Sequence, residues 1–333
     1  MIRKLAAATV LALLAVAAPA AATHVQCGDT ITEDTVLDSD IQCGPNQEHG
    51  IIIGASDVTL QMAGHKITAS AAGADNGGGI RTLYQEPFLS NVEVRRGVIE
   101  GFRWGVILAA DDSAAMKLTV AQGYHGIYLY GDRIYAYANT LDFPPHPSQF
   151  GDENGPAIQL TGDDAYAWGN VLTGSPFHGI TAEGERPRIV LNDVEGCSGP
   201  QSGLGVNIGG YSTWAVVNRN KVGGNCFDPI AAYANDNSAG GAKIALNQVT
   251  GGWDGMYVSD PGAIVGRNTA SGASQRGIHI ASAGTTVRRN TATDNGQYGI
   301  FGPVGTVDGG GNKAAGNGDG TTPQCVNVVC SAP

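Results

Sequence analysis

The sequence predicts an all-β chain folded as a single-stranded right-handed parallel β-helix, a solenoid of about eleven short coils. Three observations predict it: a Gly-Ile marker that recurs along the chain, asparagines at a constant distance behind many markers, and alternating apolar and polar residues between the two. No segment after residue 23 shows the 3.6-residue apolar period of an amphipathic helix.

The first observation is a repeat in which glycine, or a close substitute, precedes an apolar residue. The shortest spacing, from Val106 to Ile127, is 21 residues, and the longest, from Ile127 to Ile158, is 31 residues. Such a period matches one β-helix coil and is too short for a propeller blade of about 40 residues. The apolar marker positions are Ile51, Ile80, Val106, Ile127, Ile158, Ile180, Val206, Ile230, Met256, Ile278 and Ile300.

The second observation is an asparagine that stands twelve residues after the marker in seven coils. Asparagines stacked in a turn can hydrogen-bond along the solenoid axis, and asparagine tolerates the left-handed backbone that tight turns need. We therefore expect a structural ladder formed by Asn139, Asn170, Asn192, Asn218, Asn268, Asn290 and Asn312.

The third observation is alternation, as in the stretch 277–282, which predicts strands with Ile278 and Ile280 inward and His279 outward. Each coil is therefore expected to hold a strand, a short turn, a second strand, the asparagine turn, a third strand and a variable loop.

The N-terminal residues predict export. Arg3 and Lys4 precede an apolar run over 5–18 and the small residues 20–22, the pattern of a signal peptide over 1–22. We divide the rest into an N-terminal cap over 23–50, the β-helix over 51–315 and a disulfide-closed tail over 316–333. No later run approaches the roughly 18 apolar residues of a membrane span, so we expect a secreted, extracellular protein without a transmembrane segment.

Charge and cysteine content narrow the chemistry further. A formal net charge of −11 disfavours nucleic acid and anionic membranes as partners, and polyanionic sugars too unless a cation mediates. We expect a monomer. Six cysteines in an exported chain predict disulfides, and their three sequence-local couples pair Cys27 with Cys43, Cys197 with Cys226, and Cys325 with Cys330. Zinc is the alternative, but the Cys-x-x-Cys spacing is absent, so no metal site is predicted.

The markers, the asparagines and the opening stretch 51–67 resemble the parallel β-helix repeat proteins of the pectate-lyase-like superfamily, with NosD-type repeats as the nearest subgroup. The resemblance covers residues 27–315. It implies that a substrate would lie along the outward face of the Gly-Ile strands, beside the variable loops. It implies no single activity, because such proteins include lyases, glycosidases, epimerases and adhesins. The segment 227–230 shares only Asp-Pro with the alginate epimerase motif.

Aromatic and hydrogen-bonding residues follow one another on that face, which favours a polysaccharide or cell-envelope glycan as the partner. Each such position also lies beside a turn, so an ordinary exposed surface residue is the alternative explanation. The substrate-binding candidates are Tyr128, Tyr130, His178, Glu183, Tyr233 and Tyr257.

Asp228 and Asp254 form the sharpest catalytic candidate. Both stand two residues before the marker, on adjacent coils about 4.8 Å apart, and two carboxylates this close predict one raised pKa. Arg276 and His279 follow on the next coil. If the protein is an enzyme, we expect these four residues to carry the acid–base chemistry of a polysaccharide lyase or glycoside hydrolase. The alternative is a non-enzymatic solenoid that binds glycan or the cell envelope.

Two further features bear on the ligand. An acidic column in the turn after the first strand would suit calcium, but aspartate is also a turn residue and Arg133 and Arg186 interleave as counter-charges, so turn chemistry is favoured and the cofactor stays unknown. The insertion between Phe143 and Asn154 is expected to border the ligand groove. The acidic column comprises Asp111, Asp112, Asp132, Asp163, Asp164 and Glu185.

Overall fold

The computed structural model describes residues 22–45, 47–70, 77–83, 88–121, 123, 125–143, 155–174, 178–197, 203–209, 212–224, 226–233 and 240–333. Residues 1–21 of the expected signal peptide and residues 144–154 of the expected groove loop lie outside this description. Within it, every regular element is a strand, and no helix is long and apolar enough to cross a membrane.

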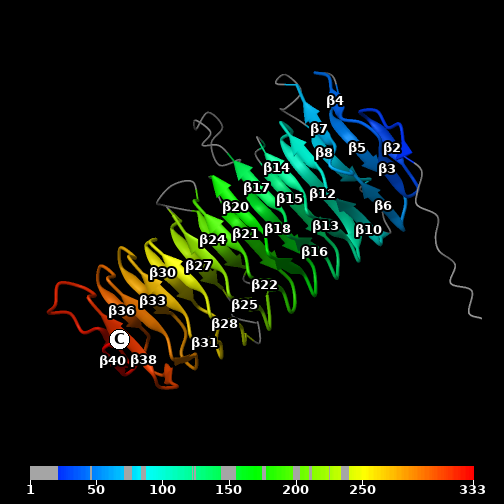
Figure 1. Ribbon diagram of the computed structural model, residues 1–333. Helices are drawn as coiled ribbons and strands as arrows, with labels where there is room; N and C mark the ends of the chain where they lie inside the picture. Colours follow the sequence, from blue (N-terminus) through cyan, green and yellow to red (C-terminus); the bar gives the residue numbers. More distant parts are fainter. Residues whose placement is uncertain are drawn as a thin grey trace, which may run out of the picture.

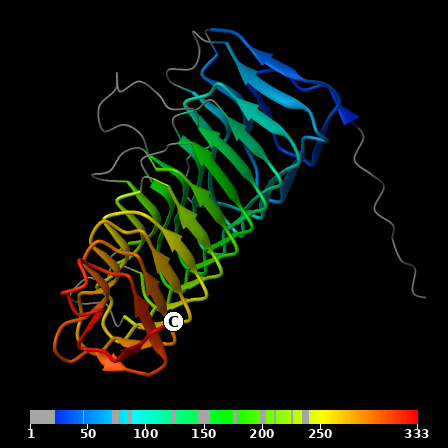
Figure 2. The same ribbon diagram turned by 60° about the vertical axis from the view of Figure 1, so that its left-hand side comes forward.

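The chain winds into three parallel sheets around one axis, in about twelve turns. The turns succeed one another in sequence order, so the molecule is a long rod with the N-terminal turns at the blue end and the C-terminal turns at the red end (Figures 1 and 2). An all-β parallel solenoid is therefore confirmed, and its right-handed sense stays a prediction.

The first sheet contains the Gly-Ile strands, with β9 (Leu89–Ser90) paired beside β12. Its strands in order are β2 (Asp29–Ile31), β5 (His49–Ile53), β8 (Gly78–Thr82), β12 (Trp104–Asp111), β15 (His125–Tyr130), β18 (Pro156–Thr161), β21 (His178–Glu183), β24 (Leu204–Ile208), β27 (Asp228–Ala232), β30 (Asp254–Val258), β33 (Arg276–Ile280), β36 (Tyr298–Phe301) and β39 (Cys325–Val326).

The second sheet lies between the first turn of each coil and the asparagine turn. Its strands are β1 (Ala22–Thr23), β3 (Thr35–Leu37), β6 (Val58–Gln61), β10 (Val92–Arg95), β13 (Ala114–Met116), β16 (Tyr135–Tyr137), β19 (Tyr166–Trp168), β22 (Arg188–Val190), β25 (Val216–Asn218), β28 (Lys243–Ala245), β31 (Ile264–Gly266), β34 (Thr286–Arg288) and β37 (Val307–Asp308).

The third sheet follows the asparagine turn. Its strands are β4 (Ile41–Cys43), β7 (Lys66–Ala69), β11 (Val98–Glu100), β14 (Thr119–Ala121), β17 (Thr140–Phe143), β20 (Val171–Gly174), β23 (Asp193–Glu195), β26 (Lys221–Gly223), β29 (Gln248–Thr250), β32 (Thr269–Ser271), β35 (Thr291–Thr293), β38 (Asn312–Ala315) and β40 (Cys330–Ser331).

The marker residues stack one above another through the core. Ile51 pairs with Ile80 at one end of the series and Ile278 with Ile300 at the other, and all four are fully buried. The marker glycine permits this close stacking: a Cβ on Gly179 would lie only 2.3 Å from the carbonyl oxygen of Gly205. The predicted repeat and its register are therefore confirmed.

The asparagine ladder exists, but its membership differs from the prediction. Asn139 donates from its backbone N and from Nδ2 to Oδ1 of Asn170, at 3.0 and 2.9 Å, and the pattern repeats along the rod. Asn218 is not a member, because it lies two residues before the turn, at the end of β25. The members are Asn139, Asn170, Asn192, Asn220, Asn247, Asn268, Asn290 and Asn312.

The left-handed backbone at this turn also differs from the expectation. It belongs to the residue before the asparagine, as in Arg219 (φ 55°) and Arg267 (φ 60°). The asparagine side chain is thus used for its hydrogen bonds, while the preceding residue carries the strained conformation.

The three predicted disulfides are present. Cys27 bonds Cys43 within the first turn, and Cys325 bonds Cys330 between β39 and β40 in the last turn. Cys197 bonds Cys226, and these two residues follow the neighbouring strands β23 and β26. The bonds therefore close both ends of the rod and join two adjacent turns in its middle.

Candidate functional site

The residues two positions before the marker form a hydrogen-bonded column on the first sheet. His49 Nδ1 accepts the backbone N–H of Gly78 at 3.3 Å, and His178 Nδ1 accepts that of Leu204 at 3.0 Å. Each side chain thereby satisfies a backbone donor of the next turn. This structural use of the column was not predicted from the sequence.

Asp228 and Asp254 continue that column. Asp228 Oδ1 accepts the backbone N–H of Asp254 at 3.1 Å, and Asp254 Oδ1 accepts that of Arg276 at 3.2 Å. Both aspartates are only 3% exposed. Their low exposure follows because each carboxylate lies against the backbone of the following turn.

The second carboxylate oxygen of Asp254 holds a polar cluster together. Its Oδ2 lies 2.7 Å from Nδ1 of His279 and 3.3 Å from Nη1 of Arg276, and the same guanidinium nitrogen lies 2.6 Å from His279 Nδ1. One ring nitrogen either donates to the carboxylate or accepts from the guanidinium, so the protonation of His279 decides which contact is a hydrogen bond. Asp254, Arg276 and His279 thus lie together as predicted, although their catalytic role stays a proposal.

The three side chains of this cluster differ in their exposure to solvent. The side chain of Asp254 is 5% exposed, whereas His279 is 16% and Arg276 is 25% exposed. A ligand on the outward face would therefore meet the imidazole and the guanidinium, with the carboxylate behind them. The buried Nε of Arg276 has no hydrogen-bond partner among the residues that the structure describes.

Asp228 has a strongly raised pKa. Burial raises the pKa of its carboxyl to about 7, the hydrogen bond from the Asp254 backbone lowers it, and the Asp254 charge adds a smaller rise. The sequence predicted a raised pKa from repulsion between the two carboxylates. The structure gives desolvation as the larger cause.

An aromatic wall adjoins the cluster. The Tyr233 and Tyr257 ring centroids lie 5.4 Å apart, and Tyr257 stands edge-on to His279 at 5.1 Å. Burial raises the pKa of Tyr233 to about 12, so its hydroxyl remains a hydrogen-bond donor at neutral pH. Phe301 contacts His279 at 5.6 Å and lies under the Arg276 guanidinium at 5.2 Å. Sequence reasoning missed Phe301, although it stands one residue after a marker, as His279 does.

Tyr128 and Tyr130 lie elsewhere on the sheet. The strand register places Tyr128 five turns from Tyr257, about 24 Å along the axis. Its buried hydroxyl lies 3.0 Å from His125 Nδ1, and the His125 ring stacks on Trp104 at 3.8 Å. Trp104, His125 and Tyr128 thus form a second aromatic group. A pocket of about 690 Å³ is lined in part by Tyr130.

His178 and Glu183 occupy the middle of the sheet, at the two ends of β21. His178 is two turns from Asp228, and burial lowers its pKa. Glu183 lies beside Gly209, where a Cβ would come within 2.7 Å of its Cγ. Of the six substrate-binding candidates, only Tyr233 and Tyr257 belong to the aromatic wall beside Asp254, Arg276 and His279.

The acidic turn column forms internal hydrogen bonds. Asp111 Oδ1 accepts the backbone N–H of Asp132 at 2.8 Å, and Asp132 Oδ1 accepts that of Asp163 at 2.9 Å. The other aspartates of the column form ion pairs: Asp112 with Arg133, and Asp164 with Arg186. In the part of the chain that the structure describes, no group of three or more His, Cys, Asp or Glu side chains could hold a metal ion.

Comparison with known proteins supports the architecture. No family model matches the chain, and no curated protein sequence matches it either. The A-module of the Azotobacter vinelandii mannuronan C-5 epimerase AlgE4 is similar in structure, with a TM-score of 0.62 at 14% identity over 91% of this chain and 90% of that one.

Two further similar structures are longer than this chain. The periplasmic alginate epimerase AlgG has a TM-score of 0.56 at 14% identity, covering 76% of this chain and 65% of its own. The tailspike of E. coli bacteriophage HK620, bound to a pentasaccharide, has a TM-score of 0.57 at 12% identity, covering 86% and 61%. At these identities the likeness establishes the fold alone: the chain is a parallel β-helix.

Proposed function

We propose that this protein is exported, binds an acidic polysaccharide along the outward face of the first sheet, and acts on it as a lyase through the cluster of Asp254, Arg276 and His279. The observation that carries the proposal is the contact of Asp254 with both His279 and Arg276 beneath an aromatic wall. The disulfides and the expected signal peptide support export.

The geometry favours proton abstraction over glycoside hydrolysis. A retaining glycosidase needs one carboxylate free to attack the sugar. Asp254 is bound on both oxygens, and Asp228 is nearly covered and bound on one. An imidazole oriented by a carboxylate is instead a suitable general base near neutral pH.

In the proposed reaction, His279 takes the proton on the carbon next to the sugar carboxylate. Arg276 neutralises that carboxylate and stabilises the negative charge that develops on it. The electron pair of the broken C–H bond forms the new C=C bond, while the glycosidic C–O bond breaks. The hydroxyl of Tyr257, which lies beside His279, supplies the proton to the leaving oxygen.

Two of the similar structures are an alginate epimerase and a mannuronan C-5 epimerase. Inversion at C-5 of a uronate begins with removal of the proton next to the carboxylate, the same first step as in the proposed elimination. These likenesses support a polysaccharide ligand, and the cluster supports its acidic class.

A non-enzymatic glycan-binding solenoid is the second candidate. The observation in its favour is that His49 and His178 accept a backbone N–H of the next turn, as Asp228 and Asp254 do. A structural column of this kind explains one oxygen of each aspartate without any catalysis.

Incubation of the purified protein with polygalacturonate and with alginate distinguishes the candidates. Elimination produces an ultraviolet-absorbing unsaturated end, hydrolysis produces reducing ends without that absorbance, and binding without turnover produces neither. We expect elimination, and a loss of about 100-fold or more in kcat for His279→Gln. The matched control is His65→Gln, because His65 also contacts an aspartate, Asp40, but does so at 3.2 Å in the first turns of the rod. Full activity of His279→Gln, or equal loss in the control, would contradict the site.

A further inference from the structure

The outward face of the second sheet carries an aromatic platform. Tyr135 and Tyr137 on β16 pair with Tyr166 and Trp168 on β19. The Tyr137 and Trp168 rings are stacked at 4.6 Å, and the Tyr135 and Tyr166 centroids lie 6.2 Å apart. Tyr135 is 42% exposed. These four rings on two adjacent turns present apolar area to solvent, which is the surface that stacks on sugar rings.

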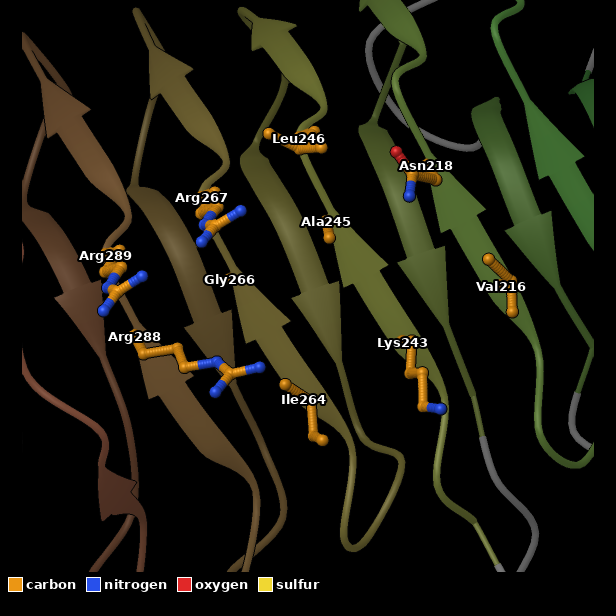
Figure 3. Close-up of a pocket in the computed structure, with 10 residues that line it drawn as sticks. All are labelled: Val216, Asn218, Lys243, Ala245, Leu246, Ile264, Gly266, Arg267, Arg288 and Arg289. Atoms are coloured by element: carbon orange, nitrogen blue, oxygen red, sulfur yellow. The ribbon is translucent and has the colours of Figure 1, made fainter.

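A basic groove lies farther along the same face (Figure 3). Its volume is about 540 Å³. Small residues, Ala245 and Gly266, form part of its lining, and the Arg288 side chain lies against Gly266, where a Cβ would come within 3.3 Å of its Cγ. Figure 3 shows four cationic side chains at this groove, contributed by Lys243, Arg267, Arg288 and Arg289.

These four cations differ from three basic residues elsewhere on the rod. Arg133, Arg186 and Lys221 each pair with a carboxylate. None of the four groove cations has a carboxylate within 4.0 Å among the residues that the structure describes, and no Asp or Glu lines the groove. In a chain of net charge −11, four adjacent unpaired cations repel one another unless an anion lies between them.

The platform and the groove belong to one continuous track. The register runs from Trp168 through Val190 and Asn218 to Ala245, and then through Gly266 to Arg288. Three turns separate Trp168 from Ala245, which is about 14 Å along the axis. A linear molecule lying along the rod would therefore meet the rings first and the cations next.

We propose that this track on the second sheet is a separate binding surface for a linear carboxylated polysaccharide. The rings stack on sugar units, and the groove cations bind carboxylates that recur along the polymer. Exposed apolar side chains beside the cations, such as Leu246, favour sugar C–H faces. The groove has no aromatic ring of its own for base stacking, which disfavours a single-stranded nucleic acid. The track is on a different sheet from the proposed lyase site, so it does not depend on that function.

The test is binding of polygalacturonate by isothermal titration calorimetry, with dextran as the uncharged polysaccharide. We expect polygalacturonate to bind the wild-type protein, and the double variant Arg267→Gln/Arg289→Gln to weaken Kd by about tenfold or more. Trp168→Ala should also weaken binding, by about fivefold, since stacking on a ring is worth roughly 1 kcal/mol. Both arginines lie in exposed turns, so the fold should persist.

The matched control is Arg133→Gln/Arg186→Gln, which removes the same charge from another corner of the rod. Equal weakening by the control pair would show an effect of net charge and would overturn the proposal. So would unchanged affinity in the groove variant, or an oligodeoxynucleotide that binds as tightly as polygalacturonate. The variant His279→Gln distinguishes the track from the proposed lyase site. Polygalacturonate should still bind to the track of this variant, whether or not the wild-type protein cleaves the polymer.

Discussion

At the scale of single residues, one position in the repeat has two uses. Asp254 gives one carboxylate oxygen to the backbone N–H of Arg276 and the other to the side chain of His279. A histidine in the same column, such as His178, accepts the backbone bond through one ring nitrogen. Aspartate thus keeps the structural bond and still has an acceptor for a neighbouring side chain, which the proposed lyase chemistry requires.

The raised pKa of Asp228 predicts a pH-dependent stability. The folded-state pKa of about 7 exceeds the unfolded value of about 3.9, so the folded state holds an additional proton between these values and stability falls as pH rises through that window. Asp228→Asn keeps an acceptor for the Asp254 N–H but does not titrate. Its free energy of unfolding relative to wild type should therefore increase from pH 4 to pH 8, by at most about 4 kcal/mol. Thermal unfolding across this range measures it, and a constant difference would contradict the burial of the charge.

At the scale of elements, the asparagine turn stabilises the corner of the solenoid between the second and third sheets. Asn290 Oδ1 accepts two hydrogen bonds from Asn268, and its Nδ2 donates to the carbonyl of Val265 at 2.9 Å and to Asn312 Oδ1. The buried amide therefore satisfies groups on both neighbouring turns.

Replacement of Asn290 by Leu should destabilise the protein by about 1 to 3 kcal/mol, because buried donors and acceptors on both neighbouring turns lose their partner. The matched control is Asn218→Leu, a change at a half-buried asparagine outside the ladder, which should alter the free energy of unfolding by less than about 0.5 kcal/mol. Chemical denaturation measures both. Similar effects in the two variants would count against the ladder.

From the hydrogen bonds of the acidic turn column, we predict that calcium does not change the thermal stability of the protein. Its carboxylates already accept backbone N–H groups or pair with Arg133 and Arg186. We therefore expect the same Tm, within about 1 °C, in EDTA and in millimolar calcium chloride. A Tm that fell in EDTA and recovered with calcium would assign the column to a metal.

At the scale of the whole molecule, the rod behaves as a stack of turns in which each turn contacts its neighbours. Covalent links therefore act locally, at the two ends and at the joint between β23 and β26. The same geometry gives each sheet its own outward face, so the proposed lyase site on the first sheet and the proposed track on the second sheet lie on separate faces.

The middle disulfide should stabilise more than the C-terminal one. Cys197 and Cys226 are separated by 29 residues, and Cys325 and Cys330 by 5. Loop-closure entropy then gives about 4 kcal/mol for the first bond and about 2 kcal/mol for the second. Paired serine substitutions, compared by thermal unfolding, should lower Tm in this order. The reverse order would show that end fraying, and not loop length, limits stability.

The sequence by itself determined the repeat, the inward markers, the three sheets and the disulfide pairs, because these follow from periodicity and from cysteines close along the chain. It also brought Asp254, Arg276 and His279 together, since equal offsets from the marker place Asp254 and Arg276 in one column and His279 lies on the same strand as Arg276. It misassigned Asn218, because residues between a marker and its turn vary in number, and a count along the chain does not detect them.

Only the tertiary structure decided the rest. The burial of Asp228, the backbone bonds of its column and the contact of Phe301 with Arg276 depend on how one turn covers the next. The groove that Lys243, Arg267, Arg288 and Arg289 line forms only when separate turns of the chain are stacked. Charge pairing and solvation depend on distances between side chains of neighbouring turns. The packing of the turns sets those distances, and the order of residues within a single turn does not.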